Sequence, residues 1–200
     1  EQWNAIEKSE GWNVEIPATE VICSDGAVNL MDAGLYQTHG TFTSWDTLVN
    51  NGDITVEDNV ITSSSYDIPR GKLVIPEGIG GIGDSAFFGT GLTGVSIPSS
   101  VTKLENVAFD SNNFGDNLTF APGSQLVEIG DKAFDGARLT SIEIPASVEI
   151  IGNSAFSDNH DLSTFVFEGT VAQWNAITKG TGWNSNSINK IICSDGEVQL

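Results

Sequence analysis

The densest group of side chains that could bind a ligand lies in the segment DSNNFGDN, residues 110–117. Within seven residues this segment supplies four oxygen donors, which are Asp110, Asn112, Asn113 and Asp116. Carboxylate and amide oxygens are ligands that calcium prefers, so a weak calcium site is one interpretation. The segment lacks the spacing and the terminal glutamate of an EF-hand loop. The simpler interpretation is a turn in which Asn and Asp form local hydrogen bonds.

No pattern in the sequence predicts an enzyme. The two histidines, His39 and His160, lie in loop-like stretches with no catalytic motif around them. The patterns G-x-S-x-G, H-E-x-x-H, the P-loop and C-x-x-C are absent. The glycine-rich stretch GIGGIG at 78–83 falls in a turn of the repeat described below, so it is not interpreted as a phosphate loop. We therefore expect no catalytic residue and no cofactor.

The charge balance argues against two classes of partner. The net charge is −19, from 27 acidic and 8 basic side chains. Such a chain is repelled by nucleic-acid phosphates and by anionic lipid headgroups, so we expect neither as a partner. No apolar run approaches the ~18 residues of a membrane-spanning helix. We interpret the acidity as a source of solubility, with cation binding as the alternative.

A repeat of about 23 residues runs through the middle of the chain, within the range of leucine-rich repeats. Each of its four units contains one proline and one Ala-Phe pair. The prolines are residues 76, 98, 122 and 145, and the pairs are 86–87, 108–109, 133–134 and 155–156. One unit cannot bury its apolar face alone, whereas stacked units share a continuous core. The repeat therefore predicts a solenoid.

Within each unit, alternating apolar residues before the proline predict a short strand with two side chains in the core. These pairs are Leu73/Ile75, Val95/Ile97, Leu118/Phe120 and Ile142/Ile144, and Phe165/Phe167 continue them into a fifth strand. Segments such as IGDSAF are expected to form short helical turns on the opposite, convex side. The phenylalanines of these turns, Phe87, Phe109, Phe134 and Phe156, should stack as an aromatic spine.

The outward positions of the strands are the candidate binding surface. They are Val74, Ser96, Thr119, Ser141, Glu143, Thr164 and Val166. Solenoids commonly bind partners on such a concave face. This strip is small and nearly neutral, and it lacks the Trp, Tyr and Arg side chains that anchor tight interfaces. It is interpreted either as a weak binding face or as a row of solvated strand positions.

Both ends of the array are expected to carry caps. At the C-terminal end, Thr170 and Gln173 form a capping-box pattern that predicts a helix beginning just after Thr170. Trp174 and Ile177 share one face of that helix and would cover the core. The strand KIIC at 190–193 would then join the edge of the sheet.

At the N-terminal end, alternating apolar residues in DITVEDNVITS at 53–63 predict a β-hairpin that starts the sheet. The preceding segment SWDTLVNNG at 44–52 predicts a short helix, with Ser44 as its cap and Gly52 as its stop. Residues 31–43 are interpreted as a connector.

The C-terminal segment occurs twice in the chain. EQWNAIEKSEGWN at 1–13 matches AQWNAITKGTGWN at 172–184, and VICSDGAVNL at 21–30 matches IICSDGEVQL at 191–200. We therefore expect residues 1–30 to be the end cap of a preceding unit, docked either on the hairpin at 53–63 or on a neighbouring molecule. Cys23 and Cys193 hold equivalent places, either as two unpaired core thiols or as a disulfide.

The pattern L-x-x-I-x-I-P-x-x-V-x-x-I-G-x-x-A-F over residues 72–170 resembles the BspA-like leucine-rich repeat. The segment FEGTVAQWN…IICSDG at 167–196 is similar to the closing segment of such arrays. The resemblance implies an α/β repeat solenoid, a right-handed leucine-rich-repeat array with a parallel concave sheet. The expected parts are a carried-over cap at 1–30, a connector and hairpin cap at 31–71, the repeats at 72–170 and a helix-strand cap at 171–200.

The resemblance also implies a function. BspA-like arrays occur on secreted or cell-surface bacterial proteins, and some of them are adhesins. We therefore expect a non-enzymatic interaction module that binds host or bacterial surface proteins, or glycans, as a monomer or in weak edge-to-edge association. The alternative is a structural spacer that separates other domains of a long surface protein.

Overall fold

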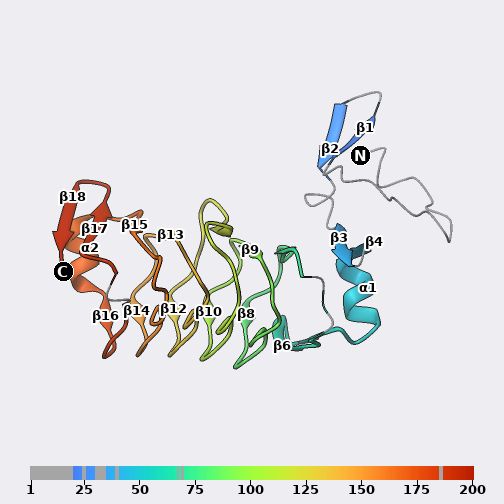
Figure 1. Cartoon of the computed structure of the whole chain (residues 1–200), viewed down its shortest axis with the longest axis horizontal. Helices are drawn as coiled ribbons and strands as arrows, with labels where there is room; N and C mark the ends of the chain where they lie inside the picture. The colour runs from blue at the N-terminus through green and yellow to red at the C-terminus, as the bar shows by residue number, and fades with distance from the viewer. Residues whose placement is uncertain are drawn as a thin grey trace.

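The computed structural model describes residues 20–23, 26–29, 35–38, 41–66, 68, 70–184 and 187–200, with side chains from Trp45 onward. The repeats form a β-solenoid whose turns stack side by side along the long axis of the molecule (Figure 1). Each turn adds one strand to each of two stacks, because the chain runs through a strand, a turn, a second short strand and a convex turn before it repeats.

The first stack contains the strands predicted before each proline. These are β7 (Lys72–Val74), β9 (Gly94–Ile97), β11 (Leu118–Phe120), β13 (Ser141–Ile144) and β15 (Thr164–Phe167). Their predicted inward residues are buried, except Phe120, which is half-buried against the same core. The alternation of apolar residues thus correctly predicts the strands of the first stack.

The second stack is a seven-stranded sheet that the hydrophobic pattern does not predict. Its strands are β5 (Ile54–Glu57), β6 (Val60–Ser64), β8 (Gly81–Ile82), β10 (Lys103–Leu104), β12 (Glu128–Ile129), β14 (Ile150–Ile151) and β16 (Thr178–Lys179). From β6 to β16 every neighbouring pair is parallel. From β8 onward each strand has only two residues, too few for an alternating pattern to be recognised.

The predicted aromatic spine is confirmed. Centroid distances are 5.2 Å for Phe87–Phe109, 5.6 Å for Phe109–Phe134 and 5.5 Å for Phe134–Phe156. The rings of these pairs are stacked and nearly parallel, with interplanar angles of 3°, 3° and 13°. Because all four side chains are fully buried, the spine joins every repeat to the next through apolar contact.

The segments that carry the spine are hydrogen-bonded turns rather than the expected helical turns. Each contains a residue in the left-handed region: Ser85 (φ 56°), Val107 (φ 60°), Lys132 (φ 56°) and Ser154 (φ 52°). An L-residue with this φ cannot continue a right-handed helix, so each convex segment reverses direction instead.

The first stack is interrupted once. Its hydrogen bonds form one sheet of β7, β9 and β11 and another that contains β13 and β15. β11 and β13 lie side by side but share no ladder, and the link beside them is a single parallel bridge between Gly115 and Leu139. The interruption falls in the third repeat, where the turn from Phe120 to Ile129 has two more residues than its counterpart after Ile144.

At the N-terminal end, the predicted hairpin and helix are present. β5 and β6 pair in antiparallel fashion, and α1 (Trp45–Asn50) ends before Gly52, whose φ is 77°. β6 pairs with β8, so the hairpin starts the seven-stranded sheet and not the sheet of predicted strands. The expected connector at 31–43 is wrong in part, because β3 (Leu35–Thr38) and β4 (Thr41–Ser44) pair there as an antiparallel hairpin.

At the C-terminal end, α2 (Val171–Ala176) begins after the predicted capping box of Thr170 and Gln173. β17 (Lys190–Cys193) joins the edge of β15, as expected, and β18 (Gly196–Gln199) then turns back on β17 as an unpredicted hairpin. Among the described residues, no helix has the length and apolar character needed to cross a bilayer.

Candidate functional site

The outward strand residues lie in register, but in two separate groups. Val74, Ser96 and Thr119 align across β7, β9 and β11, whereas Ser141 aligns with Thr164 and Glu143 with Val166 across β13 and β15. Since β11 and β13 share no ladder, the candidate binding surface consists of two short faces rather than one continuous strip. We call the first group the groove face, for the hollow described next.

A shallow groove of about 430 Å³ lies on the groove face. Its walls include the outward strand residues and the prolines that end the three strands, Pro76, Pro98 and Pro122. The hydroxyls of Ser96 and Thr119 lie 2.9 Å apart and form a hydrogen bond across neighbouring strands. The lining is therefore a mixture of apolar side chains and hydroxyl groups.

Among the described residues, Glu77 is the only charged side chain that lines this groove. Its Oε1 accepts hydrogen bonds from the Ser99 backbone N–H (2.9 Å) and hydroxyl (3.0 Å), and its Oε2 accepts one from the Ser100 N–H (3.2 Å). The hydrogen bond from the Ser99 backbone is the main cause that lowers the pKa of Glu77. The carboxylate thus stays ionised and leaves the rest of the groove neutral.

Two buried asparagines join neighbouring convex turns. Asn112 Nδ2 donates to the carbonyl oxygens of Phe109 (3.0 Å) in its own turn and of Phe87 (2.8 Å) in the preceding one. Asn159 Nδ2 does the same with Phe156 (2.9 Å) and Phe134 (2.8 Å). Because backbone carbonyls buried beside the spine need donors, each asparagine holds one repeat to the next.

These asparagines follow a spine phenylalanine by three residues, and that spacing is a signal which could have revealed them. The same position holds Thr90 in the first unit and Ala137 in the third. Thr90 donates its hydroxyl proton to Asn112 Oδ1 or to the Phe87 carbonyl, at 3.0 and 3.3 Å. The four side chains at this position are therefore small and buried, and Asn112 and Asn159 supply amide donors that Ala137 lacks.

The stacked repeats of the array agree with a match between this sequence and a family of repeat sequences. Residues 61–177 match the model of the BspA type leucine-rich repeat region, in six copies. The chain belongs to this family. The match extends beyond the four units with a complete pattern, from the hairpin strand β6 at one end to the cap helix α2 at the other.

Two solved structures are similar to this BspA-type chain. The pneumococcal vaccine antigen PcpA shows 21% identity and a TM-score of 0.47, with 72% of this chain and 49% of that chain covered. A leucine-rich cell surface protein from Faecalibacterium prausnitzii A2-165 shows 29% identity and a TM-score of 0.33, with 63% and 42% covered. This chain thus spans about half of those chains or less. No curated protein matches it.

Of the four residues in the calcium interpretation, Asn112 differs from the others in being buried. Its Oδ1 already accepts hydrogen bonds from the Leu92 N–H and the Thr90 hydroxyl, both at 3.0 Å. An oxygen so occupied is not available to a cation. The described residues contain no group of three or more His, Cys, Asp or Glu side chains placed to hold a metal. In the BspA-type array Asn112 forms one set of hydrogen bonds within its own turn and another to the preceding turn, so its contacts go beyond the local ones of the turn interpretation.

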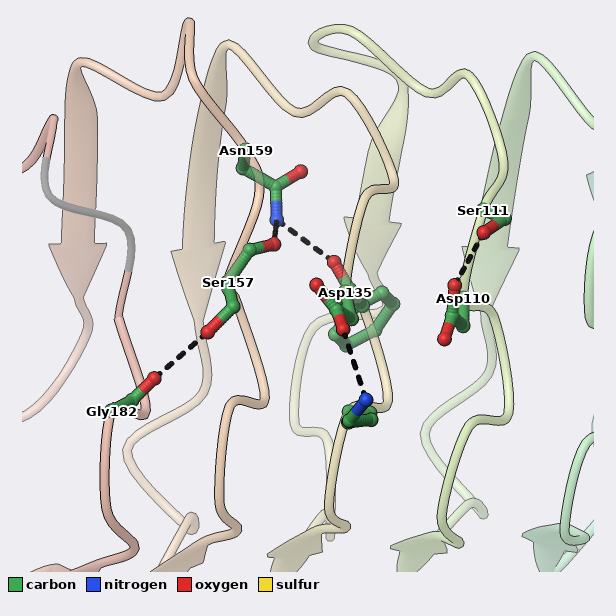
Figure 2. A network of polar contacts seen from close by, with 8 residues as sticks. Asp110, Ser111, Asp135, Ser157, Asn159 and Gly182 are labelled. Carbon is green, nitrogen blue, oxygen red and sulfur yellow. Dashed lines mark hydrogen bonds and ion pairs between the residues drawn. The ribbon is translucent and has the colours of Figure 1, made fainter.

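Figure 2 shows a row of polar residues across neighbouring turns of the array, with Asp135 between Asp110 and Ser157. The Asp135 side chain is only 14% exposed, and its Oδ1 has no hydrogen-bond partner among the residues that the structure describes. The other oxygen, Oδ2, lies 3.8 Å from Lys132 Nζ. Burial raises the pKa of Asp135, and the charges of Asp110 and Asp158 raise it further.

Replacing Asp135 with asparagine is expected to stabilise the array at neutral pH by about 1 kcal/mol, because it removes a poorly compensated buried charge. The pKa of Asp135 is raised on folding, so the folded chain binds the proton more tightly and loses stability as the pH rises. The variant should therefore have the higher free energy of unfolding at about pH 7, and the difference should vanish toward about pH 3. Urea unfolding at both pH values measures it, with the exposed Asp116→Asn as the matched control. A gain no larger than that of the control at about pH 7 would refute this account.

The surroundings of Cys193 and His160 are also described by the structure. The Cys193 thiol is buried and free, so of the two sequence interpretations the unpaired thiol holds for this residue. Burial is the main cause that raises the pKa of Cys193, which keeps the thiol protonated and unreactive. His160 is exposed in a turn, and its backbone carbonyl accepts a hydrogen bond from the Ser187 hydroxyl (2.6 Å). His39 and the side chain of Cys23 lie outside the described residues.

Proposed function

We propose that this BspA-type array is a non-enzymatic protein-interaction module of a secreted or cell-surface bacterial protein, and that it serves adhesion. Membership of a leucine-rich-repeat family supports the interaction role, since stacked repeats display a rigid extended face. The surface location rests on the resemblance of the repeats to BspA-like arrays. Host or bacterial surface proteins are the proposed partners, with glycans as a further possibility.

The observation that carries this proposal is the groove face. In a chain of net charge −19, the outward residues Val74, Ser96 and Thr119 are uncharged and line a groove. Apart from the Glu77 carboxylate, the groove is neutral and partly apolar, so it costs less to desolvate on binding than the acidic remainder of the surface. We propose it as the contact site, with the face at Ser141, Glu143, Thr164 and Val166 as the weaker candidate.

Binding of the chain to immobilised collagen, laminin and fibronectin tests this proposal. The variant Ser96→Arg/Thr119→Arg fills the groove face with two long charged side chains and is expected to weaken binding at least tenfold, or about 1.4 kcal/mol. Ser141→Arg/Thr164→Arg places the same change on the other face and serves as the matched control. If the two variants bind the immobilised proteins equally well, recognition by the groove face is refuted.

A structural spacer remains the second candidate function, and the repeated C-terminal segment favours it. Units that recur in tandem lengthen a protein and, if each binds weakly, add avidity. Failure of the unmodified chain to bind any protein or glycan of a broad panel would support the spacer over the adhesive module.

A further inference from the structure

The groove on the groove face runs across strands and not along one of them. β7, β9 and β11 each contribute their outward residue and the proline that ends the strand to its lining. Neighbouring strands of a sheet lie about 4.8 Å apart, so the outer two of these three strands are about 9.6 Å apart. The groove therefore suits an elongated partner that crosses all three strands.

The strand backbone in the middle of the groove is already hydrogen-bonded. β9 pairs with β7 on one side and with β11 on the other, so both of its edges are occupied. A partner that bound by adding a β-strand would need a free strand edge at this place. The hydrogen bond between the Ser96 and Thr119 hydroxyls also uses one of their two protons. A partner that needs few hydrogen bonds from the groove is therefore favoured.

A proline-rich segment in the polyproline II conformation meets both conditions. This helix has three residues per turn and rises about 3.1 Å per residue, so one turn spans about 9.3 Å and matches the distance from β7 to β11. Its prolines have no N–H group that would need an acceptor in the groove. Its apolar side chains can pack on walls that include Val74, Pro98 and the half-buried Phe120.

Glu77 adds a negative charge at the β7 end of the groove. Three protons hold its carboxylate in place, from the Ser99 N–H, the Ser99 hydroxyl and the Ser100 N–H. A carboxylate has about four positions for hydrogen bonds, so one position is left, and the side chain is exposed. The residues that follow the other two prolines of the groove, Ser99 and Gly123, are uncharged. A positive charge on the partner is thus favoured at the β7 end.

We propose that the groove face binds a proline-rich segment of another protein in the polyproline II conformation, with a Lys or Arg side chain at the Glu77 carboxylate. This proposal rests on the proposed function, because it names the class of partner for the same face. The net charge of −19 attracts a basic segment from solution, and the neutral walls of the groove then select its conformation.

NMR titration of the full chain with the synthetic peptides acetyl-VPPVPPR-amide and acetyl-VPPVPPQ-amide tests this proposal. The arginine peptide is expected to bind about threefold more tightly, which is within the range of an exposed ion pair. Glu77→Gln should remove this difference by weakening the binding of the arginine peptide about threefold, while the affinity for the glutamine peptide stays the same. Glu143→Gln makes the same change of charge on the other outward face and is the matched control.

Three results would overturn the proposal. They are no binding of the arginine peptide by the unmodified chain, equal affinities for the two peptides, and equal losses from Glu77→Gln and Glu143→Gln. Failure of the proposed function gives a different result, since the chain would then bind the arginine peptide but none of immobilised collagen, laminin and fibronectin. If Ser96→Arg/Thr119→Arg loses those proteins and Glu77→Gln binds them as well as the unmodified chain, adhesion by the groove face stands and this class of partner is wrong.

Discussion

Replacing Asn112 with alanine is expected to lower the free energy of unfolding by about 3 kcal/mol. The substitution removes the amide donor of the Phe87 and Phe109 carbonyls and the acceptor of the Leu92 N–H and the Thr90 hydroxyl. Each buried polar group left without a partner costs about 1–3 kcal/mol, and relaxation recovers part of the sum. Urea unfolding followed by circular dichroism measures the loss.

Asn113→Ala is the matched control for this prediction. Asn113 is the neighbouring residue and has the same side chain, but it is exposed, and its hydrogen bond to the Leu92 carbonyl comes from its backbone N–H. This variant is expected to stay within about 0.5 kcal/mol of the unmodified chain. Equal losses from the two variants would mean that the buried amide contributes nothing specific.

Replacing Phe109 with alanine is expected to cost about 3–5 kcal/mol, the range for a large aromatic residue deleted from a packed core. Phe109 is fully buried, stacks on Phe87 and Phe134, and contacts Phe114 edge-on at 5.9 Å. The cavity left behind would open the spine at its centre. Each repeat is stabilised by its interfaces with the neighbouring repeats. The loss of stability should therefore appear in both halves of the array.

The exposed Phe88 provides the control for the spine. It follows Phe87 directly, yet its side chain is 43% exposed. Phe88→Ala is therefore expected to cost less than about 1 kcal/mol. Thermal unfolding distinguishes the two variants readily, because about 1 kcal/mol shifts the midpoint of a chain of this size by about 2–4 °C. A Phe109→Ala midpoint within that interval of Phe88→Ala would contradict the role of the spine.

Much of the fold was predictable because the repeat imposes the same pattern several times. The inward pairs such as Leu73/Ile75, the spine and the Thr170 capping box each depend on residue type and spacing, which are visible in the sequence. The two-residue strands such as β10 were not predictable, because they are held by parallel partners in neighbouring turns and not by a pattern of their own.

The candidate site was less predictable than the fold. Val74, Ser96 and Thr119 were correctly placed on one face, but the interruption after β11 depends on hydrogen-bond register, which sequence spacing alone does not determine. The residue type of Asn112 suits a calcium ligand as well as a turn with local hydrogen bonds, which is the simpler interpretation. Its burial beside the spine becomes clear only when the turns are stacked.

The interruption between β11 and β13 has a mechanical consequence. On the opposite side of the same repeat, β10, β12 and β14 keep an unbroken ladder, and Phe109 stays stacked on Phe134. One wall of the solenoid is therefore continuous at this point while the other carries no ladder. We expect this joint to bend about the continuous wall more readily than the joints that have a ladder on both sides, so that the angle between the two outward faces can change while the aromatic stack stays closed.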